Sequence, residues 1–154
     1  MKETDSYLEK LDRYGPVLIK GLRLVELAAL GGLDLTITQF FVLDALIQQR
    51  VFKMSVLARA MGVKLGNMTT IIDRMIKNGL VRRYRSDDDR RVVYVALTPK
   101  GEELATRARA ERRKNFGALI RRIPEKQRIS FIKTLEEMAQ IFSAEDKVTR
   151  RTSS

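Results

Sequence analysis

The sequence predicts a mostly α-helical protein with a small β-hairpin in its middle. In the first and last thirds of the chain, apolar residues recur every three or four positions, the spacing of one face of an α-helix. Between residues 80 and 98 the spacing shortens to every second position, as in β-strands, and the polar run Ser86-Asp87-Asp88-Asp89 separates two such stretches. We therefore expect long terminal helices around a compact central unit.

The first helical region is expected from about Asp5 to Leu30. Gly15-Pro16 lies inside it, and because proline lacks an amide proton and clashes with the preceding turn, we expect a kink or two separate helices here. Gly31-Gly32 should end the region, since glycine tolerates the left-handed conformation of a helix cap.

The central unit is expected to begin at a capping box, with Thr36 as the N-cap and Gln39 reaching back to it. A helix follows, and then a short β-type run at residues 51–54. Ser55 is the expected N-cap of a brief helix over residues 56–61, which a glycine ends.

A second helix is expected from about Leu65 to Asn78, with Gly79 as its end. Two helices joined by a tight glycine-bearing turn and followed by a hairpin at residues 80–98 have the order of a winged helix-turn-helix. In that arrangement the second helix enters the major groove of DNA.

Two helices are expected at the C-terminal end, one starting at Pro99 and the next at Pro124, because proline fits the first position of a helix. The first would be roughly 36 Å long, longer than a compact domain of this size needs, which favours dimerisation. We therefore predict an N-terminal dimerisation helix region at residues 1–34 and a winged helix-turn-helix DNA-binding domain at residues 35–98. C-terminal dimerisation helices follow at residues 99–146, and a disordered tail at residues 147–154.

The amino-acid composition limits the classes of function that we expect. The chain has 30 Lys and Arg against 19 Asp and Glu, a formal charge of +11 that favours a polyanionic partner. It contains no Cys and no His, so disulfides, thiol redox chemistry and the usual zinc ligand sets are excluded. We find no catalytic motif and expect neither an enzyme nor a cofactor nor a metal site. The apolar runs are too short to cross a bilayer and no signal peptide is visible, so we expect a cytoplasmic protein without membrane contact.

The candidate DNA-binding residues lie on the second helix and on the hairpin. Asn67 can form a bidentate pair with adenine, and threonines can bond base edges or touch a thymine methyl group. Gly66 costs roughly 1 kcal/mol relative to alanine in a helix, so it either allows close approach to DNA or marks a loose first turn. The full set of candidates is Lys64, Gly66, Asn67, Thr69, Thr70, Arg74, Arg83, Arg90 and Arg91.

Arginines at the tip of a narrow hairpin fit the minor groove of DNA. Asp89 is expected to support them, because aspartates in a turn can bond its backbone and orient neighbouring arginines. Two other groups have simpler interpretations. The basic run is interpreted as a solvated helix face, with contact to DNA as the alternative, and it comprises Arg107, Arg109, Arg112, Arg113 and Lys114. The aromatic group is interpreted as core, with a ligand cavity as the alternative, and it comprises Tyr7, Tyr14, Phe40 and Phe41.

The ordered motifs of residues 33–104 resemble the MarR family of transcriptional regulators. They include Leu35-Thr36-Ile37-Thr38-Gln39, Ile71-Ile72-Asp73-Arg74-Met75, Asp89-Arg90-Arg91 and Leu97-Thr98-Pro99-Lys100-Gly101. The chain departs at Lys64-Leu65-Gly66-Asn67, where the family usually has small hydroxylated residues. The resemblance implies a homodimer on a pseudo-palindromic operator in double-stranded DNA, acting as a repressor. In many members a small aromatic or anionic effector releases the DNA.

We therefore expect a sequence-specific regulator of transcription. Two alternatives share the fold. A sequence-indifferent architectural protein would bind random DNA as well as any chosen site. A winged-helix module for protein contacts would not retard DNA at low salt.

Overall fold

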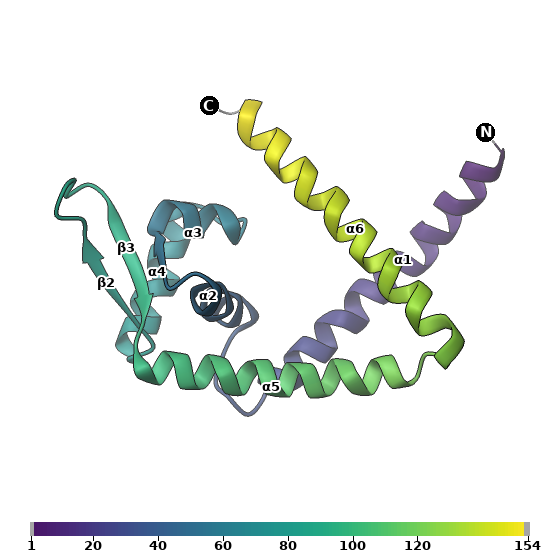
Figure 1. The fold of residues 1–154 in the computed structure, drawn as a ribbon, viewed down its shortest axis with the longest axis horizontal. Coiled ribbons are helices and arrows are strands. Elements are labelled where there is room, and N and C mark those ends of the chain that lie inside the picture. Colours follow the sequence, from purple (N-terminus) through teal and green to yellow (C-terminus); the bar gives the residue numbers. More distant parts are fainter. Residues whose placement is uncertain (1, 153–154) are drawn as a thin grey trace. The chain divides into compact units, whose positions relative to one another are not determined.

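The computed structural model describes the backbone of residues 2–152 and the side chains of residues 4–142. Within this range six α-helices and three short β-strands confirm the expected fold class (Figure 1). The chain divides into two compact units, Met1–Asn115 and Phe116–Ser154, with the division inside α5. The elements are α1 (Lys2–Leu30), α2 (Ile37–Gln48), β1 (Val51–Lys53), α3 (Met54–Ala60), α4 (Leu65–Lys77), β2 (Val81–Arg85), β3 (Val93–Leu97), α5 (Pro99–Arg121) and α6 (Glu125–Thr152).

The expected hairpin is part of a three-stranded antiparallel sheet. The strand order is β1-β3-β2, with Phe52 opposite Val95 on one side of β3 and Tyr84 opposite Tyr94 on the other. The strand β1, expected only as a β-type run, therefore extends the hairpin at its base. Figure 1 shows the far end of the β2-β3 hairpin projecting beyond the helices of its unit.

A single core holds the central elements together. Val42, Leu43 and Leu46 of α2, which are fully buried, join apolar residues from α3, α4 and the sheet. The capping box that starts α2 is present as expected, because the Thr36 hydroxyl accepts the Gln39 amide at 3.2 Å and the Gln39 side chain accepts the Thr36 amide at 2.9 Å. These bonds satisfy amides that a helix start leaves without partners.

Helix α1 and its end differ from the sequence prediction. The helix runs unbroken through Pro16, so the prediction of two helices is wrong. One proline removes a single backbone hydrogen bond, and the bonds on both sides of it continue the 29-residue helix. The helix ends at Leu30 as expected, but the left-handed residue is Asp34, with φ of 50°, rather than Gly31 or Gly32.

Two further predictions are corrected at helix ends. The N-cap of α3 is Lys53 rather than Ser55, because the helix starts at Met54 directly after β1. Helix α6 continues to Thr152, so residues 147–152 of the predicted disordered tail are helical, while residues 153 and 154 lie outside the described residues. Lysine and arginine are good helix formers, and Lys147, Arg150 and Arg151 lie in the segment where we expected a chain terminus to be disordered.

The start of α5 is tied to the end of α4. The Thr98 hydroxyl donates to the Gly79 carbonyl at 2.6 Å and accepts the Gly101 amide at 3.0 Å. The Lys100 ammonium donates to the Asn78 carbonyl at 2.9 Å. Gly79 has φ of 72°, as expected for the residue that ends a helix. The motif Thr98-Pro99-Lys100-Gly101 thus fixes the turn between α4 and β2 against α5.

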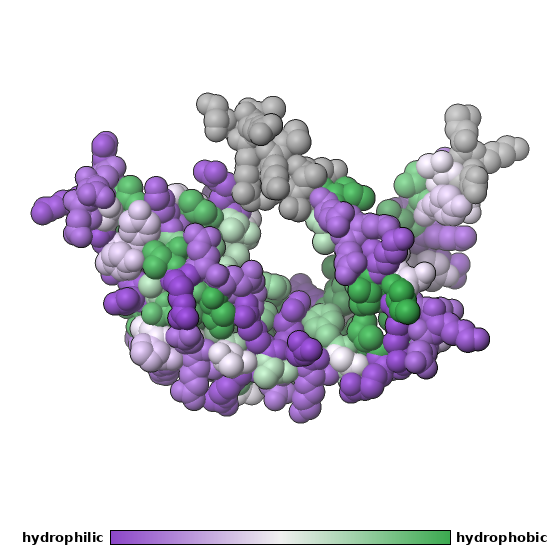
Figure 2. All heavy atoms as spheres, in the orientation of Figure 1, coloured by the Kyte–Doolittle hydropathy of each residue, from purple (hydrophilic) through white to green (hydrophobic). Residues whose placement is uncertain are grey.

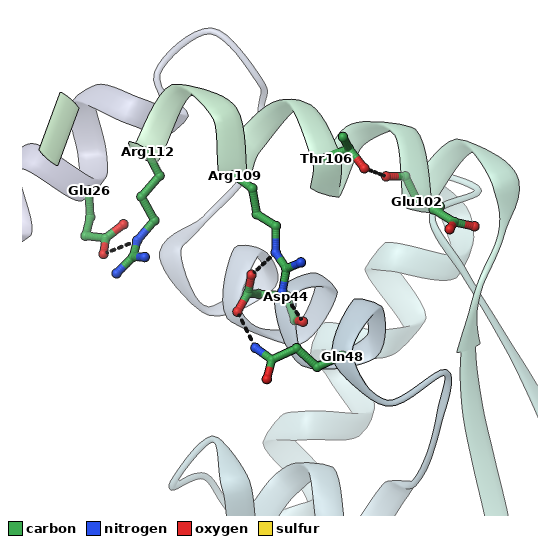
Figure 3. A network of polar contacts seen from close by, with 7 residues as sticks. All are labelled: Glu26, Asp44, Gln48, Glu102, Thr106, Arg109 and Arg112. Atoms are coloured by element: carbon green, nitrogen blue, oxygen red, sulfur yellow. Dashed lines mark hydrogen bonds and ion pairs between the residues drawn. The ribbon is translucent and has the colours of Figure 1, made fainter. Parts of the chain in front are cut away.

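Ion pairs join α5 to α1 and α2 (Figure 3). The Arg109 guanidinium pairs with the Asp44 carboxylate of α2 and also donates to the Asp44 carbonyl at 3.2 Å. The Arg112 guanidinium bonds the Glu26 carboxylate of α1 at 2.7 Å, and that carboxylate is mostly buried. A solvated face is therefore the wrong interpretation for these two arginines, which hold α1 and α2 against α5.

The second unit contains the end of α5, from Phe116 to Arg121, and the helix α6. The Arg128 guanidinium donates to the carbonyls of Ile123 and Arg121 at 2.9 and 3.0 Å, and so satisfies two acceptors at the end of α5. Apolar side chains of α6 are exposed within the chain, among them Ile129, Leu135, Met138, Ile141 and Phe142.

Candidate nucleic-acid interface

One face of α4 is anchored in the core and the other is free. Met68, Ile72 and Met75 are all 0% exposed, and they pack with α3 and the sheet. Because helix faces repeat every three or four residues, the opposite face must point away from the core. Gly66, Asn67, Thr70, Arg74 and Lys77 are exposed there. The exposed face therefore contains four of the candidate DNA-binding residues, Gly66, Asn67, Thr70 and Arg74.

The first turn of α4 is open to solvent. Lys64 is the N-cap and makes no side-chain capping bond, so the first amides of the helix have no side-chain acceptor from that residue. The side chain of Leu65, which follows, is exposed although it is apolar. Gly62, with φ of 64°, forms the turn between α3 and α4 and brings the first turn of α4 beside α3.

The two threonines of α4 use their hydroxyl hydrogens within the helix. The Thr69 hydroxyl donates to the Leu65 carbonyl at 2.9 Å, and the Thr70 hydroxyl donates to the Gly66 carbonyl at 3.3 Å. Their methyl groups and hydroxyl lone pairs remain available to a partner. Thr70 is exposed and Thr69 is half-buried.

Hydrogen bonds at Asp89 shape the tip of the hairpin. One carboxylate oxygen of Asp89 accepts the Arg91 amide at 3.0 Å and the Arg91 guanidinium at 3.3 Å. The Asp89 carbonyl accepts the Val92 amide at 2.8 Å, which closes the turn. The Arg91 side chain is 93% exposed, and Arg90 is exposed beside it. The bonds expected at Asp89 are present, and they hold the backbone amide and the Nε atom of the solvent-exposed Arg91.

Arg83 occupies a different position from the tip arginines. Its guanidinium bonds the Asp73 carboxylate of α4 at 2.9 Å, with both side chains partly exposed. The pair joins β2 to α4 and contributes at most about 1 kcal/mol at this exposure. Arg83 therefore lies between the hairpin and the helix.

Arg74 lies in the second half of α4, about 12 Å along the axis from Gly66 at 1.5 Å per residue. It borders a depression of about 530 Å³ together with Lys77 and Asn78 of α4 and Asp34 and Thr36 of the α1-α2 connection. The first turn of α4 and Arg74 are therefore separate parts of the exposed face.

A cleft of about 820 Å³ lies between the hairpin and the helices α3 and α4. Ser55, Leu65 and Thr69 line its helical side, and Arg83, Arg85 and Arg91 line its hairpin side. The sequence offered no reason to assign Leu65 a role in this cleft. The twofold alternation of the hairpin places Arg83 and Arg85 on the strand face that looks toward α4.

The opposite face of the hairpin carries an aromatic pair that sequence reasoning also missed. The rings of Tyr84 and Tyr94, which are cross-strand partners, stack at 5.7 Å between centroids. The Arg82 guanidinium lies 6.0 Å from the centre of the Tyr84 ring. Such pairs stabilise a two-stranded ribbon, so this face supports the hairpin that carries Arg90 and Arg91.

Positive charge dominates this part of the chain. Eight Lys and Arg and four Asp lie between Lys64 and Arg91, an excess of four positive charges. Figure 2 shows that the hairpin end is covered largely by hydrophilic residues. A surface of this charge attracts a polyanion.

The candidate cavity aromatics do not form one group. Phe40 is buried in a small core with Leu30 and Ala108, so the core interpretation is correct for this residue. Tyr7 and Tyr14 are exposed on α1, and Phe41 is partly exposed. Among the described side chains no cluster of His, Cys, Asp and Glu could hold a metal ion, and none of the described helices is long and apolar enough to span a membrane.

Comparisons with known proteins agree with the fold. Residues 35–93 match the model of the MarR family. The HTH-type transcriptional regulator YhbI of Bacillus subtilis, itself uncharacterized, is 32% identical over 94 residues, which is 61% of each chain. The chain spans 61% of the length of this curated relative and 45% of the length of a second one.

Solved structures match over most of the chain. A MarR family protein from Bacillus stearothermophilus has a TM-score of 0.77 and 25% identity, covering 93% of this chain and 98% of its own. A mutant MarR from E. coli complexed with operator DNA has a TM-score of 0.72 and 22% identity, covering 86% of this chain and 95% of its own.

The sequence match includes α2, β1, α3, α4, β2 and the turn of the hairpin, and it ends at the first residue of β3. The structural matches extend the likeness to the flanking helices. Residues 35–93 therefore match the MarR family in sequence, and the solved structures extend the likeness in fold over most of the chain.

Proposed function

We propose that this protein is a sequence-specific double-stranded-DNA-binding regulator of transcription. The observation that supports this most strongly is the exposed polar face of α4, whose other face is fixed in the core, together with the exposed arginines of the hairpin tip. The α4 face would lie in the major groove, and Arg90 and Arg91 would reach the neighbouring minor groove or its phosphates. The relatives named as transcriptional regulators, and the relative complexed with operator DNA, support the same function.

The protein would bind its operator as a homodimer. Apolar side chains of α1 that are exposed within one chain support this, since exposed apolar surface of this extent is characteristic of an interface. They include Leu8, Leu11, Val17, Leu18 and Leu22. In this proposal the regions 1–34 and 99–146 hold two copies together, and each copy presents one α4 to a half-site. Light scattering on the eluted protein should give twice the chain mass of 17.7 kDa.

Regulation by a small ligand is part of the proposal. Arg74 and Lys77 supply positive charge to the depression at the α1-α2 connection, which suits an anionic effector. Repression would end if binding there changed the separation of the two α4 helices, because one spacing fits both half-sites. We propose a binding function without catalysis, exerted in the cytoplasm where the DNA is.

Selection of binding sites from a random duplex library tests this function. An enriched inverted repeat with half-sites about one helical turn apart, roughly 34 Å, is the expected result. Retention of DNA without an enriched motif would instead indicate the architectural alternative. A protein that retains no DNA at low salt would fit the protein-contact module and contradict DNA binding.

A further inference from the structure

Gly66 is unexplained by the fold itself. It is the second residue of α4, it is exposed, and its φ is not positive, so the backbone does not require glycine. A Cβ atom built at Gly66 would meet nothing within 4 Å. Glycine is also among the residues least suited to a helix interior. Alanine would fit and favour the helix, which indicates that the open space serves something outside this chain.

Leu65 and Thr70 are the neighbours of this space on the helix surface. Successive residues are about 100° apart around a helix, so Leu65 lies on one side of Gly66 and Thr70 lies close to it on the other. Leu65 is 52% exposed. The Thr70 hydroxyl donates to the Gly66 carbonyl at 3.3 Å, which commits its hydrogen to the helix and leaves its methyl group for a partner. The open space thus lies between the exposed Leu65 and Thr70, whose hydroxyl hydrogen is already bonded within the helix.

The major groove offers one apolar group among its base edges, the 5-methyl group of thymine. The N-terminal residues of a recognition helix are the ones that contact base edges. Leu65 and Gly66 are the first two residues of α4, and Thr70 lies one turn further along the same side.

We propose that the open space at Gly66 receives the 5-methyl group of a thymine in each half-site, between Leu65 and the Thr70 methyl. This inference rests on the proposed DNA-binding function and deepens it, because it assigns part of the base preference to three named residues. Gly66 determines the preference by leaving room, and Leu65 and Thr70 supply the apolar contact. The departure of this segment from the family's small hydroxylated residues would then be the source of a preference of its own.

Deoxyuridine tests this directly, since it differs from thymidine only by the missing methyl group. Each thymine of the selected duplex is replaced in turn, and affinity is measured by fluorescence anisotropy. One position in each half-site should lose about fourfold in affinity, the effect of one buried methyl group. The other thymines should change little.

Variants assign the effect to these residues. Gly66→Ala fills the space, so it should abolish the difference between thymidine and deoxyuridine and weaken the selected duplex, while the thermal midpoint rises. Thr70→Val keeps the methyl group and loses the hydroxyl, so the difference should persist. The double variant Leu65→Ala and Thr70→Ser removes both apolar contacts and should lose it.

These measurements distinguish failure of the thymine methyl contact from failure of the proposed regulator function. If the protein selects a site but no deoxyuridine substitution weakens binding, the methyl contact is overturned and the regulator function stands. The contact is also overturned if Gly66→Ala binds and discriminates like the unaltered protein. A library that yields no enriched site contradicts the sequence-specific function and this inference with it.

Discussion

Helix α4 and the hairpin tip both carry candidate DNA contacts, but they are held in place in different ways. The helix is fixed by Met68, Ile72 and Met75, which the core surrounds completely. The tip is shaped by the hydrogen bonds of Asp89, and its Arg91 side chain remains almost fully exposed. A rigid element can match a particular base sequence, whereas a long exposed arginine adapts to phosphates or to a groove. We therefore expect α4 to supply specificity and the tip to supply sequence-independent affinity.

The largest effect is expected from the core side of α4. Ile72→Ala removes a side chain that is 0% exposed and should lower the free energy of unfolding by about 2–5 kcal/mol. Arg90→Ala at the exposed tip should change it by no more than about 0.5 kcal/mol. Urea unfolding followed by circular dichroism measures both. Equal losses would show that the tip is as firmly packed as the helix, which would contradict the difference between a fixed α4 and an exposed tip.

Asn67→Ala tests the specificity that we assign to α4. Asn67 is exposed, so the free energy of unfolding should hardly change. Loss of its base contact should cost about 1–3 kcal/mol of binding to the selected site and relax the preference at one base position in each half-site. Anisotropy titrations on the selected duplex and on single-base variants measure this. An equal loss on random duplex would place Asn67 on the backbone of the DNA instead.

Local sequence patterns predicted the helix ends that local chemistry determines. The capping box of Thr36 with Gln39, and the helix-ending glycines Gly62 and Gly79, lie where the sequence predicted them. Each depends on residues within about one turn of each other, so the local sequence is enough to predict its position.

Features that depend on distant partners could not be predicted in the same way. The strand β1 has three residues, and it exists because β3, more than 40 residues later, pairs with it. The pairs of Arg109 with Asp44 and of Arg112 with Glu26 join residues 65 and 86 positions apart. In the candidate site, Asp89 and Arg91 are two residues apart and were predicted together. The bond of Arg83 to Asp73 was missed because it needs the packing of β2 on α4.

Arg91→Ala should have a smaller effect that is uniform across sequences. The variant loses one contact to phosphate or to the minor groove, so affinity should fall equally for selected and random duplexes. The slope of log affinity against log salt should become shallower by about 1. Titrations at several salt concentrations measure the slope. A loss confined to the selected duplex would show that Arg91 reads bases, and the division of roles between helix and tip would be wrong.

Asp89→Ala should have the smallest effect, and its sign separates two roles of the carboxylate. As a negative charge near DNA, Asp89 opposes binding, whereas as an acceptor for Arg91 it orients a contact. Asp88→Ala removes the same charge from the tip and leaves the Asp89 bonds in place, so it isolates the first role.

We expect Asp88→Ala to bind random duplex at least as well as the unaltered protein, and Asp89→Ala to bind it less well than Asp88→Ala. Added to Arg91→Ala, Asp89→Ala should cause no further loss of affinity, because the Arg91 side chain that Asp89 orients is then absent. Equal affinities of the two single variants would mean that the Asp89 bonds shape the turn without helping Arg91 to reach DNA.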